Sequence, residues 1–180
     1  MDEKVQIQKT MNGDTYAFGY FVDKYQDMAM TIAYRVCQNL QDAEDVVQDS
    51  FIKAYRNLHA FKTESKFSTW LYSIVYNTAK TAVLRKVRYE DYEQIDESGL
   101  YSDLDTMNSI EENEKKELLN TALKKMPVDE SVMLSLYYLE DIEIKEIAKI
   151  LGLTKSNVKV ILHRARKRMQ TIMIKLLKKY

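Results

Sequence analysis

Residues that form turns and cross-links are scarce in this sequence of 180 residues. One proline and four glycines are too few for the tight turns of a protein built from many strands. No segment shows the sustained alternation of apolar and polar residues that is typical of half-buried strands. Leucine, isoleucine, lysine, glutamate and glutamine are plentiful instead. The sequence therefore predicts an all-α fold.

Residues that commonly carry catalysis or bind metals are also few. The single cysteine, Cys37, cannot form an internal disulfide, and its apolar neighbours favour a small buried side chain over a nucleophile. The two histidines, His59 and His163, lie in separate segments, and the scattered glycines do not form a phosphate-binding loop. We therefore expect that the protein is not an enzyme and has no catalytic residue, bound metal or cofactor.

Long hydrophobic runs are missing as well. No apolar stretch approaches the roughly 18 residues that a membrane-spanning helix requires. The first ten residues carry acidic side chains and lack the apolar core of a secretory signal. We therefore expect a cytoplasmic protein that does not insert into membranes.

Helical spacing of apolar residues dominates the first half of the chain. It runs from Asp14 to about Val36 and predicts one long helix with a single buried face. Asp42 resembles an N-cap for a second helix, because carboxylates follow it in the first turn. A third helix is predicted to start near Ser68. Together they predict an N-terminal helical domain over residues 1–88.

Residues 89–117 are strongly acidic, with eleven Asp and Glu against two Lys. Such a composition without a steady apolar stripe is typical of an exposed linker, which we place at residues 89–113. Two interpretations are open for this linker. It is either a solvated tether or an acidic strand that mimics nucleic acid in a basic channel of a partner.

A C-terminal domain is predicted over residues 114–180. Helical spacing resumes at Leu118 and is interrupted by Pro127. A short amphipathic helix then ends at Gly152, which can adopt the left-handed C′ conformation, and Thr154 is a suitable N-cap for the next helix. This order predicts a helix-turn-helix, whose second helix enters the DNA major groove.

Positive charge collects on that last helix. Residues 154–180 contain nine Lys and Arg and no acidic residue. Val158, Leu162, Ala165 and Met169 fall on one narrow arc and should be buried. The residues predicted to read bases or grip phosphates are Lys155, Ser156, Asn157, Lys159, Val160, His163, Arg164 and Lys167. The alternative is a solvated basic face on an ordinary helical hairpin.

A second basic segment lies in the N-terminal block. Residues 53–88 hold eight basic residues and one acidic residue, interleaved with aromatic rings on which unpaired bases can stack. The candidate contacts to single-stranded DNA are Phe61, Lys62, Lys66, Phe67, Trp70, Tyr76, Asn77 and Lys80. Phe67 and Trp70 sit at the start of a helix, where such rings are more often core or staple residues than stacking platforms. Helical spacing predicts that Tyr76, Asn77 and Lys80 point away from the buried stripe.

Carboxylates gather on the preceding helix at Asp42, Glu44, Asp45 and Asp49. They are not accompanied by histidine or cysteine ligands, and capping and the helix dipole explain their position. A protein partner with a basic surface is therefore the better functional interpretation.

The segments "DAEDVVQDSFIKAYRNLHAF", "KFSTWLYSIVYNTAK" and "ALKKMPVDESVMLSLYYLEDIEIKEIAKILGLTKSNVKVILHRARKRM" resemble the bacterial sigma-70 family, specifically its extracytoplasmic-function (ECF) sigma factors. The resemblance covers nearly the whole chain and implies a subunit that binds core RNA polymerase and selects promoters. It departs from the family pattern at Thr81, where an Asp is frequent, and at Val160 and Ile161, which replace polar residues.

The resemblance also implies a role for each candidate surface. The C-terminal set would read the minus-35 element as a duplex, and the N-terminal set would capture and melt the minus-10 element. Polymerase docking would fall on Asp42, Glu44, Asp45, Gln48 and Asp49. Many relatives are held inactive by an anti-sigma factor, which is therefore a candidate partner. The alternatives are a helix-turn-helix regulator that is not a polymerase subunit and a helical adaptor that binds only proteins.

Overall fold

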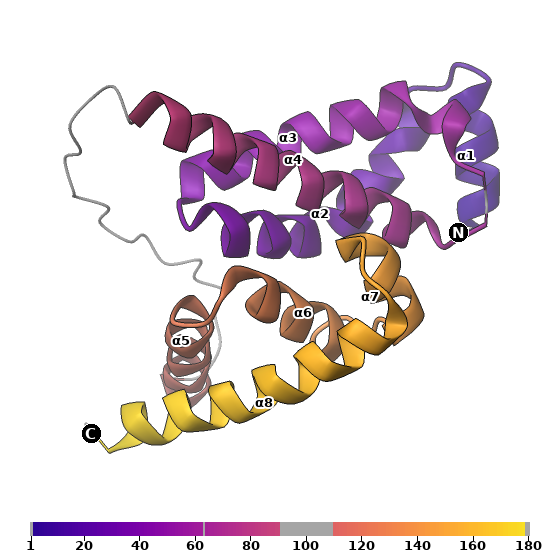
Figure 1. Ribbon diagram of the computed structural model, residues 1–180. Helices are drawn as coiled ribbons and strands as arrows, with labels where there is room; N and C mark the ends of the chain where they lie inside the picture. Colours follow the sequence, from indigo (N-terminus) through magenta and orange to yellow (C-terminus); the bar gives the residue numbers. More distant parts are fainter. Residues whose placement is uncertain (1, 63, 91–109, 179–180) are drawn as a thin grey trace.

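The computed structural model describes residues 2–62, 64–90 and 110–178, which form helices and contain no strand (Figure 1). The predicted all-α fold is thus confirmed. In chain order the elements are α1 (Glu3–Met11), α2 (Tyr16–Cys37), α3 (Leu40–Arg56), the 3₁₀ turn η1 (Leu58–Ala60), α4 (Phe67–Glu90), α5 (Ile110–Lys124), α6 (Val128–Tyr138), α7 (Ile144–Leu151) and α8 (Lys155–Leu177).

Helices α2, α3 and α4 pack into the predicted N-terminal bundle. Phe21 and Ile32 on α2 and Leu71 and Val75 on α4 are completely buried at the centre of its core. Burying each such side chain contributes roughly 1.5–3 kcal/mol, so the shared apolar face holds these helices together. α3 adds Val46, Phe51 and Ala54 to the same core.

The start of α3 differs from the prediction. Its N-cap is Asn39, whose backbone is extended and whose Oδ1 accepts a hydrogen bond from the backbone N–H of Asp42 at 3.0 Å. Asp42 therefore lies inside the first turn and is not the cap. An asparagine side chain satisfies the unpaired N–H groups one turn earlier, which leaves the Asp42 carboxylate available for other contacts.

Helix α1 was not predicted from the sequence. Asp2 caps it by accepting a hydrogen bond from the backbone N–H of Lys4 at 3.0 Å. Its contacts include polar ones with α2, since Glu3 accepts hydrogen bonds from Lys24 at 2.6 Å and from the Tyr25 hydroxyl, and Ile7 packs against the core. A helix held in this way lacks an apolar stripe, which is why spacing did not reveal it.

The helix-turn-helix forms as predicted. α7 ends at Gly152, whose φ of 66° lies in the left-handed region that favours glycine. Thr154 then caps α8, because its Oγ1 accepts a hydrogen bond from the backbone N–H of Asn157 at 3.2 Å. Val158, Leu162 and Ala165 are buried in the C-terminal core, and Met169 is half-buried.

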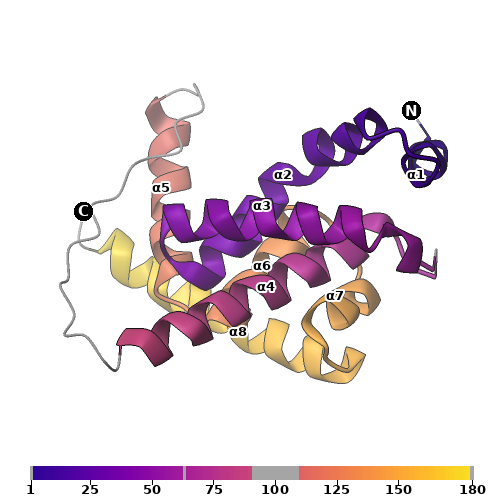
Figure 2. The ribbon, with the colours of Figure 1, turned by 90° about the horizontal axis from the view of Figure 1, so that it is seen from above.

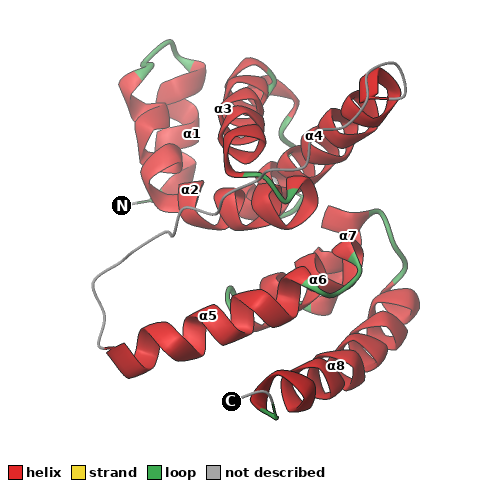
Figure 3. Cartoon of the chain, turned by 90° about the vertical axis from the view of Figure 1, so that its left-hand side faces the viewer, coloured by secondary structure: helices red, strands yellow, loops and turns green. Residues whose placement is uncertain are grey.

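The helices form two layers, with α1–α4 in one and α5–α8 in the other (Figure 1, Figure 3). The layers touch where α6 packs on α2 and α7 packs on α4, and buried apolar residues continue from one layer into the other (Figure 2). α4 and α5 both extend into the segment that we predicted as the linker. Residues 91–109, which hold most of that segment, lie outside the described residues.

Candidate nucleic-acid and protein interfaces

The helix that follows the turn presents an exposed polar and basic face. Each α8 residue that we predicted to face DNA is exposed, and Val160 shows 54% of its surface to solvent. The set comprises Lys155, Ser156, Asn157, Lys159, Val160, His163, Arg164 and Lys167. A helix with this face free and the opposite face packed has the geometry that duplex reading requires.

Two other basic residues of α8 have structural partners. Arg168 Nε donates to Glu130 Oε2 on α6 at 2.9 Å, and the Glu130 side chain is only 11% exposed. Arg166 Nε donates to the carbonyl of Leu162 at 3.3 Å. The Arg168–Glu130 ion pair links α8 to α6. Some basic residues of α8 therefore contact the rest of the domain, and the others face solvent.

Aromatic rings cluster at the end of η1 and the start of α4. The ring centroids of Phe61 and Trp70 lie 5.3 Å apart, and those of Phe67 and Trp70 lie 5.6 Å apart. Phe67 is only 2% exposed and also packs on Phe21 at 4.2 Å. Phe67 therefore presents no exposed ring face to a base in this conformation. It is a core residue. Phe61 and Trp70 remain half-buried.

Tyr76 was predicted to point away from the buried stripe of its helix, but it is not exposed to solvent. Tyr76 is 3% exposed, and its hydroxyl donates to Asp129 Oδ1 on α6 at 2.6 Å. Burial, followed by the hydrogen bond to Asp129, raises the pKa of Tyr76 well above the ordinary tyrosine value. The cause is the second layer, which covers a face of α4 that the N-terminal bundle leaves open.

The other predicted minus-10 residues keep access to solvent. Lys62, Lys66, Asn77 and Lys80 are exposed, and Lys80 Nζ lies 5.2 Å from the centre of the Tyr76 ring. Beside them an open groove of about 410 Å³ runs between α3 and α4. Its lining includes Lys53, Asn57, Trp70, Asn77 and Thr81. Amide, hydroxyl, indole and ammonium groups thus share one concave surface, a combination suited to an unpaired base and its phosphate.

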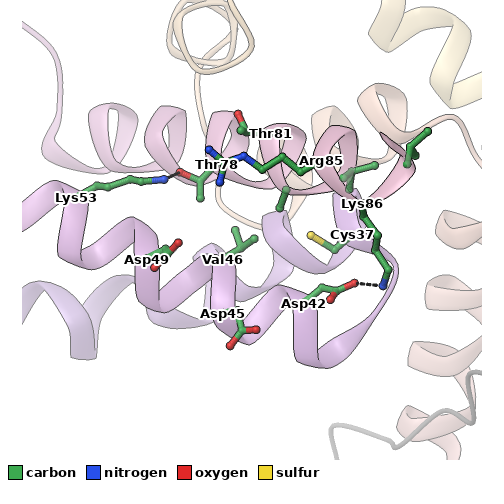
Figure 4. Close-up of a pocket in the computed structure, with 13 residues that line it drawn as sticks. Cys37, Asp42, Asp45, Val46, Asp49, Lys53, Thr78, Thr81, Arg85 and Lys86 are labelled. Carbon is green, nitrogen blue, oxygen red and sulfur yellow. Dashed lines mark hydrogen bonds and ion pairs between the residues drawn. The ribbon is translucent and has the colours of Figure 1, made fainter. Parts of the chain in front are cut away.

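A second groove between the same helices combines opposite charges (Figure 4). Its volume is about 570 Å³, and α3 contributes Asp42, Asp45 and Asp49 while α4 contributes Arg85 and Lys86. Asp42 Oδ2 pairs with Lys86 Nζ at 2.8 Å. Glu44, Asp45, Gln48 and Asp49 are exposed, so most of the predicted docking set faces solvent.

Cys37 lines this groove and is half-buried. Burial, together with the nearby carboxylate of Asp42, raises the pKa of its thiol to about 11. The thiol is therefore protonated near neutral pH and is a poor nucleophile.

Within the described ranges we find no group of three or more His, Cys, Asp or Glu side chains placed to hold a metal ion. None of the helices in those ranges has both the length and the apolar surface to cross a membrane.

Two models of known protein families match this chain, one in each layer. Residues 21–89 match the family model of sigma-70 region 2, and residues 116–169 match that of sigma-70 region 4. The region 2 match is not expected for a regulator that shares only the helix-turn-helix. The fold is similar to CnrH in its complex with the cytosolic domain of CnrY, at a TM-score of 0.68 and 21% identity, covering 95% of this chain and 96% of CnrH.

Two relatives resemble the chain over almost its full length. ECF RNA polymerase sigma factor SigW of Bacillus subtilis (strain 168) is 34% identical over 172 residues, which span 91% of this chain and 92% of SigW. The ECF RNA polymerase sigma-E factor of Haemophilus influenzae is 31% identical over 175 residues, which span 92% of each protein. The chain therefore belongs to the extracytoplasmic-function (ECF) sigma factors of the sigma-70 family, which direct transcription initiation.

Proposed function

We propose that the two layers divide promoter recognition between them, with α8 reading the minus-35 element as duplex DNA. The exposed basic face of α8, directly after a glycine turn and a threonine cap, carries this proposal. Arg164 can donate two hydrogen bonds to a guanine, Asn157 lies near the helix N-terminus within reach of a base or phosphate, and Val160 can contact a thymine methyl group. Lys155, Lys159 and Lys167 would hold phosphates, which makes binding steeply dependent on salt.

The N-terminal layer would hold the melted minus-10 strand. The open groove lined by Trp70 and Asn77 supports this assignment, because an indole can stack on a base while an amide reads its edge. Lys62, Lys66 and Lys80 are exposed nearby and can neutralise phosphates. Phe61 is half-buried, so part of its ring can contact a base. The buried Phe67 packs against the Phe61 ring.

The acidic side of α3 would dock on core RNA polymerase. Exposed carboxylates at Glu44, Asp45 and Asp49, together with Gln48, face solvent beside the charged groove. A basic helical surface on the polymerase would complement them, and such complementarity sets orientation and association rate. We propose that the protein performs this role in the cytoplasm and is not an enzyme. Residues 89–113 would connect the domains of residues 1–88 and 114–180.

An anti-sigma factor is a candidate partner. The RpoE sigma factor of Bartonella quintana, solved in complex with the anti-sigma factor NepR, has a similar fold at a TM-score of 0.66 and 21% identity, covering 85% of this chain and 96% of RpoE. That likeness shows the fold, and the partner is our proposal for this chain.

Replacing Asp45 with lysine is expected to weaken binding to core polymerase about five- to tenfold, since an exposed charge pair is worth up to about 1 kcal/mol and reversal also adds repulsion. The affinity is measured by fluorescence anisotropy of the labelled full chain titrated with bacterial core polymerase. Duplex DNA affinity should not fall, because α8 is unchanged.

Asp23→Lys is the matched control, since Asp23 is an exposed carboxylate on α2 outside the docking set. If Asp45→Lys binds core polymerase as tightly as Asp23→Lys does, the assignment of the docking surface to α3 is wrong.

A further inference from the structure

Helix α1 lies at the end of the N-terminal bundle where η1 and the start of α4 also lie (Figure 1). It packs against both α2 and η1. Gln6 and Thr10 on this helix are buried, and Thr10 Oγ1 donates to the carbonyl of Gln6 at 2.8 Å. At helical spacing the face turned to the bundle carries Glu3, Gln6, Ile7 and Thr10. The helix therefore meets the bundle through a mostly polar face.

A polar cluster centred on Glu3 joins α1 to α2. Glu3 Oε1 accepts a hydrogen bond from Lys24 Nζ at 2.6 Å and another from the Tyr25 hydroxyl. The bond from Lys24 to Glu3 raises the pKa of Lys24 above the ordinary lysine value. Hydrogen bonds to a charged group are stronger than those between neutral groups. Because Ile7 is the one apolar residue on this face, we expect the Glu3 bonds to carry much of the attachment of α1.

Tyr25 connects this cluster to the aromatic rings at the start of α4. Tyr25 is 8% exposed, and its ring centroid lies 5.9 Å from that of Phe67, the first residue of α4. The Phe67 centroid lies 5.6 Å from those of both Phe61 and Trp70, the half-buried rings proposed to meet the strand. Packed rings leave little free space, so a shift of one displaces its neighbours. A continuous series of contacts thus runs from Glu3 to Trp70.

The backbone around Phe61 gives that ring little support of its own. Phe61 follows a 3₁₀ turn of three residues, and its N–H donates to the carbonyl of Leu58 at 3.0 Å. The described residues between Phe61 and α4 belong to no helix or strand. The position of Phe61 therefore depends on the packing of its side chain and on the contact of η1 with α1.

We propose that α1 is a brace for the strand-binding rings Phe61 and Trp70. Glu3 is then a positioning residue, which acts through Tyr25 and Phe67. The described lining of the groove beside Trp70 comes from α3, α4 and the residues between them, so α1 would change strand affinity without contacting the strand. This inference rests on the proposed function of the N-terminal layer. The alternative is a helix that only stabilises the bundle.

Glu3→Ala is the main test, because it removes both hydrogen bonds and alanine favours the helix. It also removes a negative charge, which by itself strengthens binding to a polyanion. The brace predicts the opposite sign. Strand affinity should fall about two- to tenfold, because fewer molecules hold the rings in the binding arrangement. The measurement is fluorescence anisotropy of a fluorescein-labelled oligothymidine strand titrated with the full chain.

Asp23→Ala is the matched control. It removes an exposed carboxylate on α2, next to Lys24, and leaves Glu3 unchanged. This variant should bind the strand at least as tightly as the parent. Tyr25→Phe is a second test variant, which removes only the hydroxyl bonded to Glu3 and keeps the ring in the core. It should weaken strand binding as Glu3→Ala does, and circular dichroism checks that every variant is folded under the binding conditions.

The position of the rings is measured without DNA. Trp70 is the single tryptophan of the chain, so intrinsic tryptophan fluorescence reports on this site alone. Acrylamide should quench Trp70 more strongly in Glu3→Ala and Tyr25→Phe than in the parent and in Asp23→Ala. A helix that only stabilises the bundle would leave the quenching of the folded chain unchanged.

Unchanged quenching in both Glu3→Ala and Tyr25→Phe would overturn the link between α1 and the rings, whatever the DNA results. Stronger quenching with strand affinity equal to that of Asp23→Ala would refute the role of α1 in strand binding. If neither the parent nor any variant binds oligothymidine, the proposed function of the N-terminal surface fails, and the inference fails with it. The quenching data then still show whether α1 holds the rings in place.

Discussion

Replacing Leu162 with alanine is expected to destabilise the C-terminal domain by about 2–5 kcal/mol. Leu162 is 1% exposed and lies on the packed side of α8 between Val158 and Ala165, which are both completely buried. Its removal costs the transfer free energy of the lost methyl and methylene groups and leaves a cavity that neighbouring side chains fill only partly. Urea unfolding followed by circular dichroism measures the change in the free energy of unfolding.

Leu177→Ala is the matched control, because Leu177 lies on the same helix but is 58% exposed. An exposed substitution of this kind should change stability by less than about 0.5 kcal/mol. Equal losses for Leu162 and Leu177 would contradict the assignment of the buried stripe, and with it the orientation of the DNA-reading face.

Replacing Arg164 with alanine is expected to weaken binding to the preferred minus-35 duplex by about 1–3 kcal/mol and to relax specificity at one base pair. Arg164 is exposed on the reading face, and its guanidinium fork matches the two acceptors of guanine in the major groove. The measurement is competition binding of the variant to duplexes that differ at single positions.

Lys175→Ala removes the same charge from an exposed position in the last turn of α8. This control should lose affinity evenly across sequences, as expected for an electrostatic contribution without base reading. If Arg164→Ala also loses affinity evenly across all duplexes, Arg164 contacts phosphate and reads no base.

Local signals in the sequence predicted the helix-turn-helix well. Gly152 acts through its left-handed backbone and Thr154 through a side-chain hydrogen bond to Asn157 in the next turn, so their roles depend little on the rest of the fold. The buried stripe at Val158, Leu162 and Ala165 follows from helical spacing alone. The exposed face of α8 was therefore predictable residue by residue.

Features that depend on distant segments were not predictable in the same way. Helical spacing assumes one buried face, but α4 packs against α2 and α3 and also against α7. The pattern for Tyr76 cannot reveal a partner that lies 53 residues further along the chain. The start of α3 was predicted at the wrong residue. Asn39, three residues before Asp42, accepts the hydrogen bond that caps the first turn. The polar contact of α1 with α2 likewise has no periodic signature.

The candidate sites show the same division. The acidic residues of α3 were found by charge, but their groove with Arg85 and Lys86 needed the packing of α3 on α4. The groove lined by Trp70 and Asn77 also joins residues from separate helices. Composition thus indicated the candidate surfaces, whereas their shapes and the covering of Tyr76 depend on tertiary contacts.

The most direct test of the account is run-off transcription with sigma-free bacterial core polymerase on a library of promoter fragments, with and without this protein. We predict transcripts that appear only when the protein is present, from fragments that share two elements at a fixed spacing. Specific duplex binding by the protein, without any initiation by its cognate core polymerase, would contradict a role in initiation.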